Sequence, residues 1–197
     1  MISKNSWLRS ELPQLLFLVL FIFAARSSLA DHYLVPSGSM EETIQVGDRV
    51  LVDKRAHGLR VPFTNIEIAA GVDVARGEVV IFDSPQNGTR LIKRIVAIGG
   101  DQVALRNGHL SINDVPLVAD NSEEDFGGRT AQLNLRDGGG PDHYIKRIPE
   151  GMLLAVGDHR GNSLDGRFFG LISEDDIYGR AVAIYYRRGD AFVWKPL

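Results

Sequence analysis

The chain has 197 residues, with 22 Lys and Arg against 25 Asp and Glu, so its formal net charge is -3. This length allows roughly one domain of about 150 residues behind an N-terminal leader, or one domain with an elaborated insertion. The lack of a basic surplus and of a DNA-reading motif argues against a nucleic-acid partner, and the lack of cysteine excludes a disulfide framework and a thiolate metal site.

The N-terminus carries an apolar segment. Lys4 and Arg9 precede an uninterrupted apolar run over residues 15–25. A membrane-spanning helix needs about 20 apolar residues, so residues 12–30 would have to serve as the anchor. The small residues up to Ala30 also suit a cleaved signal peptide, and a buried core helix is a third interpretation. Basic residues before the run predict that the rest of the chain lies on the outer side of the membrane.

After residue 31 the pattern changes to short aliphatic or alternating runs separated by glycine, which is typical of strands. Asn107-Gly108 and Asn113-Asp114 predict tight turns. Residues 120–142 are polar and rich in glycine, so we expect a long loop or a mobile insertion rather than core. Strand-like sequence returns over residues 152–186. The predicted strands before the insertion are residues 49–52, 78–82, 91–98, 102–105 and 109–112.

Ser39 and Lys93 could form a hydrolase site without a histidine base. Ser39 lies in Ser37-Gly38-Ser39-Met40, and Lys93 lies in an otherwise aliphatic run. Burial lowers the pKa of a lysine, and a neutral amine can take the proton from a serine hydroxyl. In the alternative interpretation, Lys93 and Arg94 face solvent from a half-buried strand.

Five blocks in order resemble bacterial type I signal peptidases, the membrane-bound Ser-Lys endopeptidases that remove signal peptides. The blocks are the apolar N-terminal segment, residues 36–40 followed by Gly47-Asp48, residues 76–82, residues 92–94 followed by Gly99-Gly100-Asp101, and Gly157-Asp158 through Arg167. The resemblance implies a mainly β fold of twisted antiparallel sheets forming a partly open barrel, preceded by one membrane helix. It also implies a serine endopeptidase that needs no cofactor.

The resemblance assigns roles to individual residues. Ser39 would be the nucleophile and Lys93 the general base, while Ser37 and the Ser39 backbone N–H would hold the oxyanion. Ser163 would orient the lysine amine by a hydrogen bond. Asp165 and Arg167 would form an ion pair beneath the site. Gly157, Asp158 and Asn162 complete this supporting set.

The block that ends at Ser163 departs from the pattern Gly-Asp-Asn-Arg-Asp-Asn-Ser most often seen in the family. Here it has His159 in place of the first Asn and Gly161 in place of the second Asp. Asp158, His159 and Ser163 lie too close in sequence to face one another as a triad, so we expect His159 to be a surface or turn residue. The remaining histidines show no ligand spacing, and no metal site is expected.

Apolar neighbours of the proposed pair would form pockets for small side chains at the -1 and -3 positions of an extended peptide. These neighbours are Val35, Pro36, Ile44, Leu91 and Ile92. Ordinary core packing is the alternative interpretation of them.

The resemblance also predicts an organisation and a location. We expect a short cytoplasmic N-terminus (1–11), an uncleaved membrane anchor (12–30) and an extracytoplasmic catalytic domain (31–197) with a variable insertion at about 104–150. The protein would lie in the bacterial inner membrane, contact the lipid bilayer and cleave exported preproteins after small-x-small sites. A dedicated pilin or conjugation-type peptidase of the same family and a catalytically silent, membrane-tethered β binding module are the alternatives. A self-cleaving repressor would need a DNA-binding domain where this chain has its apolar leader.

Overall fold

The computed structural model describes residues 11–19, 30–55, 59–60, 67–69, 73–120 and 122–197. Residues 11–19 form a helix whose side chains are exposed, so this part of the leader is not a core helix. Within the described ranges, no helix combines the length and the apolar character that crossing a bilayer requires. Residues 20–29, the larger part of the expected anchor, lie outside the described residues.

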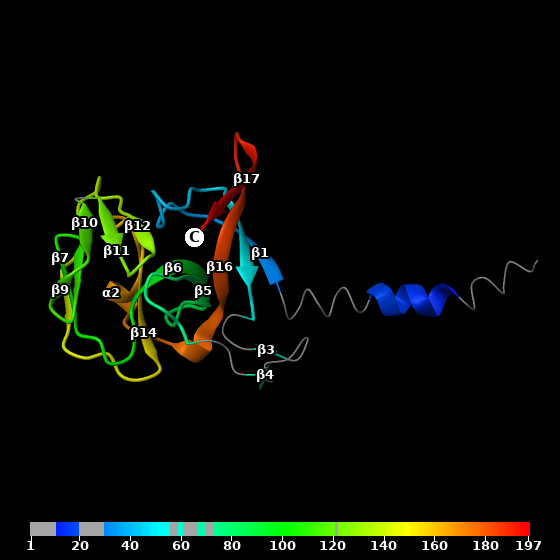
Figure 1. Cartoon of the computed structure of the whole chain (residues 1–197), viewed down its shortest axis with the longest axis horizontal. Coiled ribbons are helices and arrows are strands. Elements are labelled where there is room, and N and C mark those ends of the chain that lie inside the picture. The colour runs from blue at the N-terminus through cyan, green and yellow to red at the C-terminus, as the bar shows by residue number, and fades with distance from the viewer. Residues whose placement is uncertain (1–10, 20–29, 56–58, 61–66, 70–72, 121) are drawn as a thin grey trace, which may run out of the picture.

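The largest sheet holds eight of the described strands in the order β1-β2-β16-β5-β6-β14-β15, with β17 also paired to β16. All pairings in this sheet are antiparallel. In Figure 1 the long strand β16 connects the β1, β2 and β17 side of the molecule with β5. The strands are β1 (Ala30–Leu34), β2 (Arg49–Asp53), β5 (Val79–Asp83), β6 (Arg90–Ala97), β14 (Met152–Val156), β15 (Ile172–Ser173), β16 (Ile177–Arg187) and β17 (Ala191–Pro196).

Three smaller sheets accompany it, with the orders β13-β7-β8-β9, β10-β11-β12 and β3-β4. Most of the strands of the first two gather on the left of Figure 1, away from β17. A one-turn helix α2 (Gly166–Phe169) and a 3-10 turn η1 (Glu174–Asp176) precede β16. The strands are β3 (Leu59–Arg60), β4 (Glu67–Ala69), β7 (Val103–Arg106), β8 (His109–Ile112), β9 (Val115–Pro116), β10 (Val118–Asp120), β11 (Glu123–Asp125), β12 (Thr130–Gln132) and β13 (His143–Ile145).

The predicted mainly β, antiparallel fold is confirmed, and the predicted strands lie within one or two residues of β2, β5, β6, β7 and β8. Asn107 and Gly108 both have positive φ, 51° and 85°, between β7 and β8. This is the backbone that a two-residue hairpin turn requires, and it explains the Asn-Gly pair. Among the described strands, the main sheet runs from β1 to β15 without closing into a barrel.

The expectation that residues 120–142 lie outside the core is wrong. They contribute β11 and β12, and Glu124, Ala131, Leu133 and Asn134 are buried. Leu133 bridges to Glu42, and Asn134 bridges to His159. Strands of three residues are too short to display a period, and a glutamate that is buried through an ion pair looks like a surface residue in the sequence.

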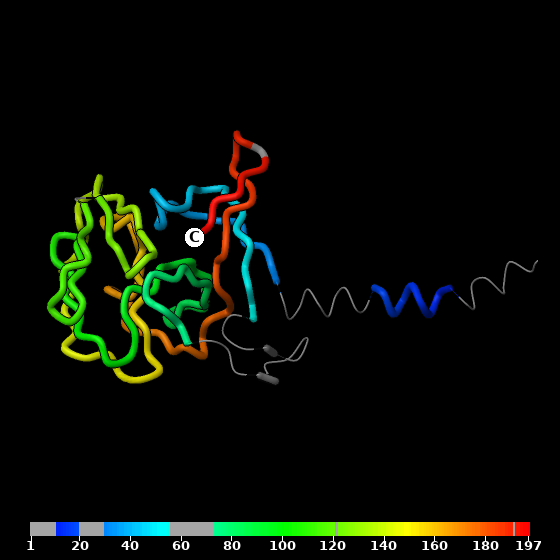
Figure 2. The backbone as a smooth tube through the Cα atoms, in the orientation of Figure 1, coloured from blue at the N-terminus to red at the C-terminus, as the bar shows by residue number. Residues whose placement is uncertain are grey.

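Strands β5 and β6 are covered on both faces, which explains their nearly continuous apolar sequences. Residues Val79 to Phe82 and Ile92 to Ala97 are buried. Successive side chains on a strand point to opposite faces, so Lys93 and Arg94 are buried in different surroundings. The tube in Figure 2 shows the chain from residue 30 to about 55 beside the C-terminal strands, so both ends of the domain meet in one sheet.

Candidate active site

The segment that carries Ser39 follows β1 and is held by its backbone. The Val35 N–H donates to the carbonyl of Asp48 (3.0 Å), and the Gly47 N–H donates to the carbonyl of Val35 (2.9 Å). Met40 is fully buried in the core cluster that includes Val35 and Ile44. Because both ends of the segment are packed, the residues between Val35 and Met40 are confined to a tight bend over β6.

Ser39 and Lys93 meet at the centre of this arrangement. Lys93 Nζ is hydrogen bonded to Ser39 Oγ at 2.6 Å and to the carbonyl of Ile92 at 3.1 Å. Lys93 is 2% exposed and Ser39 is 7% exposed. The structure therefore excludes the interpretation in which Lys93 faces solvent, and it brings together two residues that lie 54 positions apart in the sequence.

The environment of Lys93 favours the neutral amine. Burial lowers the pKa of Lys93 to about 8, although the carboxylates of Asp165 and Asp158 act in the opposite direction. The charge of Arg167 reinforces the effect of burial. Loss of water stabilisation is therefore the dominant cause, and a substantial fraction of the amine is neutral at mildly alkaline pH.

Ser37 is exposed, and its hydroxyl lies beside that of Ser39, with 3.5 Å between the two Oγ atoms. Gly38 separates them. A Cβ at Gly38 would come within 2.8 Å of the Glu41 carboxylate, so a side chain at this position would displace Glu41. Glycine at position 38 therefore leaves the Glu41 side chain undisturbed.

Arg94 and Asp158 form a buried ion pair next to the site. Arg94 donates to Asp158 from Nε (2.9 Å) and from Nη2 (2.7 Å), and Thr43 donates its hydroxyl to the same carboxylate at 2.5 Å. Arg94 also donates to the carbonyl of Gly77. The pair connects β6, the segment after β14 and the segment that follows Ser39, so it fixes the three parts that carry the proposed chemistry.

The ion pair expected between Asp165 and Arg167 is present and fully buried. Arg167 donates to both carboxylate oxygens at 2.8 Å, and the Gly157 N–H donates to Asp165 at 3.0 Å. Burial raises the pKa of the Asp165 carboxyl, but the hydrogen bonds and charge of Arg167 outweigh it, so the pKa lies below its ordinary value. A charged Asp165 is thus maintained near Lys93.

Ser163 lies close to the nucleophile segment, but in the described residues its Oγ does not form the expected hydrogen bond to Lys93. Its Oγ is buried, and a Cβ placed on Gly157 would meet both Ser163 Oγ and the Ser39 carbonyl. The two hydrogen-bond partners that the described residues provide to Lys93 Nζ are Ser39 and Ile92. Asn162 is exposed, and its N–H donates to the carbonyl of His159. The packing leaves no room for a side chain at Gly157, nor at Gly161, where a Cβ would meet the backbone of Asp137 and Gly138.

We expected His159 to be a surface or turn residue; its carbonyl accepts the turn bond from Asn162, but its side chain does not lie on the surface. It is 6% exposed, and its ring lies between the Gly38 carbonyl (3.2 Å from Nδ1) and the Asp137 carboxylate (2.8 Å from Nε2). Because Asp158 is paired with Arg94 and His159 with Asp137, the two do not form a triad with Ser163. Sequence reasoning could not find this contact, since Asp137 belongs to the segment that was expected to be a loop.

The proposed pocket residues divide into two groups. Val35, Ile44 and Ile92 are fully buried in one core cluster. Pro36 is exposed and Leu91 is half-buried, so these two side chains are the accessible members of the set. Across the described part of the chain, no group of three or more His, Cys, Asp or Glu side chains is placed to bind a metal ion.

Comparison with known proteins identifies the family. The family model for signal peptidase, peptidase S26, matches residues 7–186. The chain is similar to signal peptidase I of Pseudomonas aeruginosa, with 31% identity over 86% of this chain and 69% of that protein. It is also similar to signal peptidase I of Aquifex aeolicus, with 28% identity over 91% of this chain and 84% of that protein.

A solved structure of a signal peptidase I from Enterococcus faecalis is 27% identical in sequence to this chain. The match covers 55% of this chain and 97% of the solved chain, with a TM-score of 0.43. The family match spans both the segment that contains Ser39 and the strand that contains Lys93. The chain therefore belongs to the signal peptidase family, peptidase S26, and is a serine endopeptidase of the signal peptidase I kind.

Proposed function

We propose that this protein removes N-terminal signal peptides from exported preproteins after small-x-small sites, with Ser39 as the nucleophile and Lys93 as the general base. The observation that carries the proposal is the contact of 2.6 Å between Ser39 Oγ and the buried amine of Lys93. A serine hydroxyl is a weak nucleophile at neutral pH and needs an adjacent base. In the described residues, Lys93 Nζ is the basic nitrogen within hydrogen-bond distance of that hydroxyl.

In the first step, neutral Lys93 accepts the proton of Ser39 while Oγ attacks the scissile carbonyl carbon. Negative charge then develops on the carbonyl oxygen. The Ser39 N–H and the Ser37 hydroxyl are the proposed donors to this oxygen, and the side-by-side position of the two serine hydroxyls supports that assignment.

In the second step, the C–N bond breaks, and the Lys93 ammonium returns its proton to the leaving amine. The signal peptide remains attached to Ser39 as an ester. Lys93 then takes a proton from water while the water oxygen attacks the ester carbonyl. The C–O bond to Ser39 breaks, Ser39 Oγ takes the proton back from the Lys93 ammonium, and the signal peptide is released. Both half-reactions need an amine that gains and loses a proton near neutral pH, as a pKa of about 8 allows.

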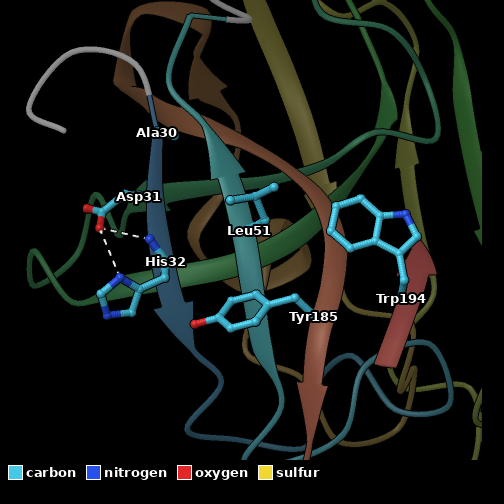
Figure 3. Close-up of a pocket in the computed structure, with 6 residues that line it drawn as sticks. All are labelled: Ala30, Asp31, His32, Leu51, Tyr185 and Trp194. Atoms are coloured by element: carbon cyan, nitrogen blue, oxygen red, sulfur yellow. Dashed lines mark hydrogen bonds and ion pairs between the residues drawn. The ribbon is translucent and has the colours of Figure 1, made fainter. Parts of the chain in front are cut away.

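We further propose that the catalytic domain rests on the outer leaflet of the inner membrane. Leu34, Phe192 and Trp194 are 58%, 76% and 58% exposed on β1 and β17. Figure 3 shows Trp194, Tyr185 and Leu51 along one face of the main sheet, where they line a shallow pocket with Ala30, Asp31 and His32. Aromatic side chains with a polar edge favour the membrane interface, and Ala30 is where the leader joins the domain.

The proposal is tested by incubating purified full-length protein in detergent with a preprotein that has a small-x-small site. The wild type should cleave after the small residue, whereas the Ser39→Ala, Lys93→Ala and Lys93→Arg variants should be inactive. Lys93→Arg should fail because a guanidinium does not lose its proton near neutral pH. Circular dichroism checks that each variant is folded. Activity in a folded Lys93→Ala protein would contradict the assignment of the base.

A panel of unrelated preproteins distinguishes a general peptidase from one dedicated to a pilin-type substrate.

A further inference from the structure

His159 contacts both peptide groups that flank the proposed nucleophile. Its backbone N–H donates to the Ser39 carbonyl at 3.1 Å, and its ring Nδ1 lies 3.2 Å from the Gly38 carbonyl. The Gly38 carbonyl also accepts from the Glu41 N–H at 3.1 Å. A carbonyl oxygen has two lone pairs and can accept both bonds, so the Gly38–Ser39 peptide is held from two directions.

The orientation of this peptide matters because its N–H belongs to Ser39. The peptide unit is planar, and its C=O and N–H point in opposite directions. A donor that fixes the Gly38 carbonyl therefore also fixes the direction of the Ser39 N–H. Gly38 has no side chain to restrict its backbone, so external contacts must set the plane of the following peptide.

The imidazole is itself held in place by Asp137. Its Nε2 lies 2.8 Å from the Asp137 carboxylate, and the Glu41 carboxylate is 3.7 Å from Nδ1. The Gly38 carbonyl can only accept, so this contact is a hydrogen bond when Nδ1 carries a proton. Asp137 lies three residues after Asn134, which pairs with the His159 backbone in a β-bridge. The side-chain contact of Asp137 therefore holds His159 against the same segment as the bridge does.

We propose that His159 is a positioning residue that aims the Ser39 N–H at the developing oxyanion, with Asp137 holding its ring. The inference rests on the proposed function, because the oxyanion arises only if Ser39 attacks a carbonyl. It goes beyond the dyad, since it assigns part of the oxyanion geometry to a side chain outside the Ser-Lys pair. The expected consequence is an effect on kcat with little effect on KM, because the donor acts when charge develops.

Two substitutions separate the two ring contacts. The amide nitrogen of Asn occupies the place of Nδ1 relative to Cβ, so His159→Asn keeps a donor for the Gly38 carbonyl and loses Asp137. The amide nitrogen of Gln occupies the place of Nε2, so His159→Gln keeps Asp137 and loses Gly38. Each variant removes one contact from the same buried side chain, so the two form a matched pair.

We expect His159→Gln and His159→Ala to lower kcat at least about tenfold. This is less than the roughly 100- to 1,000-fold loss that follows complete removal of an oxyanion donor, because the Ser39 N–H is misdirected rather than removed. His159→Asn should stay within about threefold of wild type. The measurement is steady-state cleavage of a small-x-small peptide by full-length protein in detergent, with thermal unfolding of each variant as the control for folding. A peptide aldehyde gives a second measurement, because its hemiacetal oxygen takes the oxyanion position and its inhibition constant should follow kcat.

The outcomes distinguish the two proposals. If the wild type does not cleave the peptide, the proposed function fails. If the wild type cleaves it, but folded His159→Gln and His159→Asn proteins have equal kcat values, the positioning role is wrong while the dyad stands. A change confined to KM in the His159→Gln variant would also overturn it. Because His159→Ala could unfold, the comparison between Asn and Gln decides the question.

Discussion

The chemistry proposed for Lys93 depends on its burial. An exposed lysine has a pKa of about 10.4 and is protonated at neutral pH, whereas burial lowers the pKa of Lys93 to about 8. The aliphatic sequence around Lys93 made burial a reasonable expectation, but it did not show what would lie next to the amine. The fold places Ser39 Oγ at hydrogen-bond distance from the Lys93 amine, and the neighbouring Arg94 forms its ion pair with Asp158.

The pH dependence of cleavage provides one test at this scale. Lys93 must be neutral to accept the serine proton, so kcat/KM should rise with pH through an apparent pKa of about 8 and then level off. The measurement is the initial rate between pH 6 and 10 under conditions in which the wild type stays folded. A profile that is flat over this range would contradict the role of Lys93 as the base.

The same burial should lower the stability of the folded protein. The pKa of Lys93 is lower in the folded state than in the unfolded state, so the unfolded state binds more protons between about pH 8 and 10.4. The penalty is therefore fully present below about pH 8 and disappears as the pH rises through this window. Lys93→Met should stabilise the protein at pH 7 by up to about 3 kcal/mol while abolishing cleavage. Chemical denaturation at pH 7 and pH 10 measures this, and the gain should be smaller at pH 10.

At the scale of elements, residues 122–142 are part of the site's support rather than a peripheral loop. Glu124 on β11 forms an ion pair with Arg160, and both side chains are fully buried. Arg160 also donates to the Gly108 carbonyl, and the Leu110 N–H donates to Glu124. This pair therefore attaches β11 and the β7–β8 hairpin to the segment that contains His159.

Removing one partner of this pair should be costly. Glu124→Gln leaves the Arg160 charge buried without a carboxylate, so we expect a loss of roughly 3–5 kcal/mol in the free energy of unfolding. Glu150→Gln is the matched control, because the Arg147–Glu150 pair is 74% and 82% exposed and separated by 3.9 Å. Such a surface pair should contribute about 0–1 kcal/mol. Equal effects in urea denaturation would show that the buried pair does not support the fold.

For the whole molecule, the exposed Trp194 of β17 lines one shallow pocket together with Ala30, where the leader joins the domain. Trp194 and Phe192 are on β17, and β1 begins at Ala30. A leader anchored in the bilayer would bring this face close to the lipid. The same membrane would then hold both the enzyme and the apolar signal peptide of its substrate.

The membrane contact predicts a difference between substrates. In full-length protein reconstituted into phosphatidylethanolamine and phosphatidylglycerol vesicles, Trp194→Ser should lower cleavage of a membrane-inserted preprotein. It should leave cleavage of a short peptide in detergent unchanged. Tyr144→Ser is the control, because Tyr144 is 61% exposed but lies on β13, outside the main sheet. Equal losses for both variants, or none for either, would argue against a membrane contact at β17.

The sequence by itself determined the mainly β fold, the strands β2, β5, β6, β7 and β8 and the Asn107-Gly108 turn, because these depend on local periodicity and backbone preference. The order of its motifs indicated the family and singled out Ser39 and Lys93. Only the tertiary structure placed Glu124, Asp137 and His159, and it left Ser163 without the expected bond to Lys93. These features depend on which distant segments pack together, and a buried polar residue has the same sequence signature as an exposed one until its partner is known.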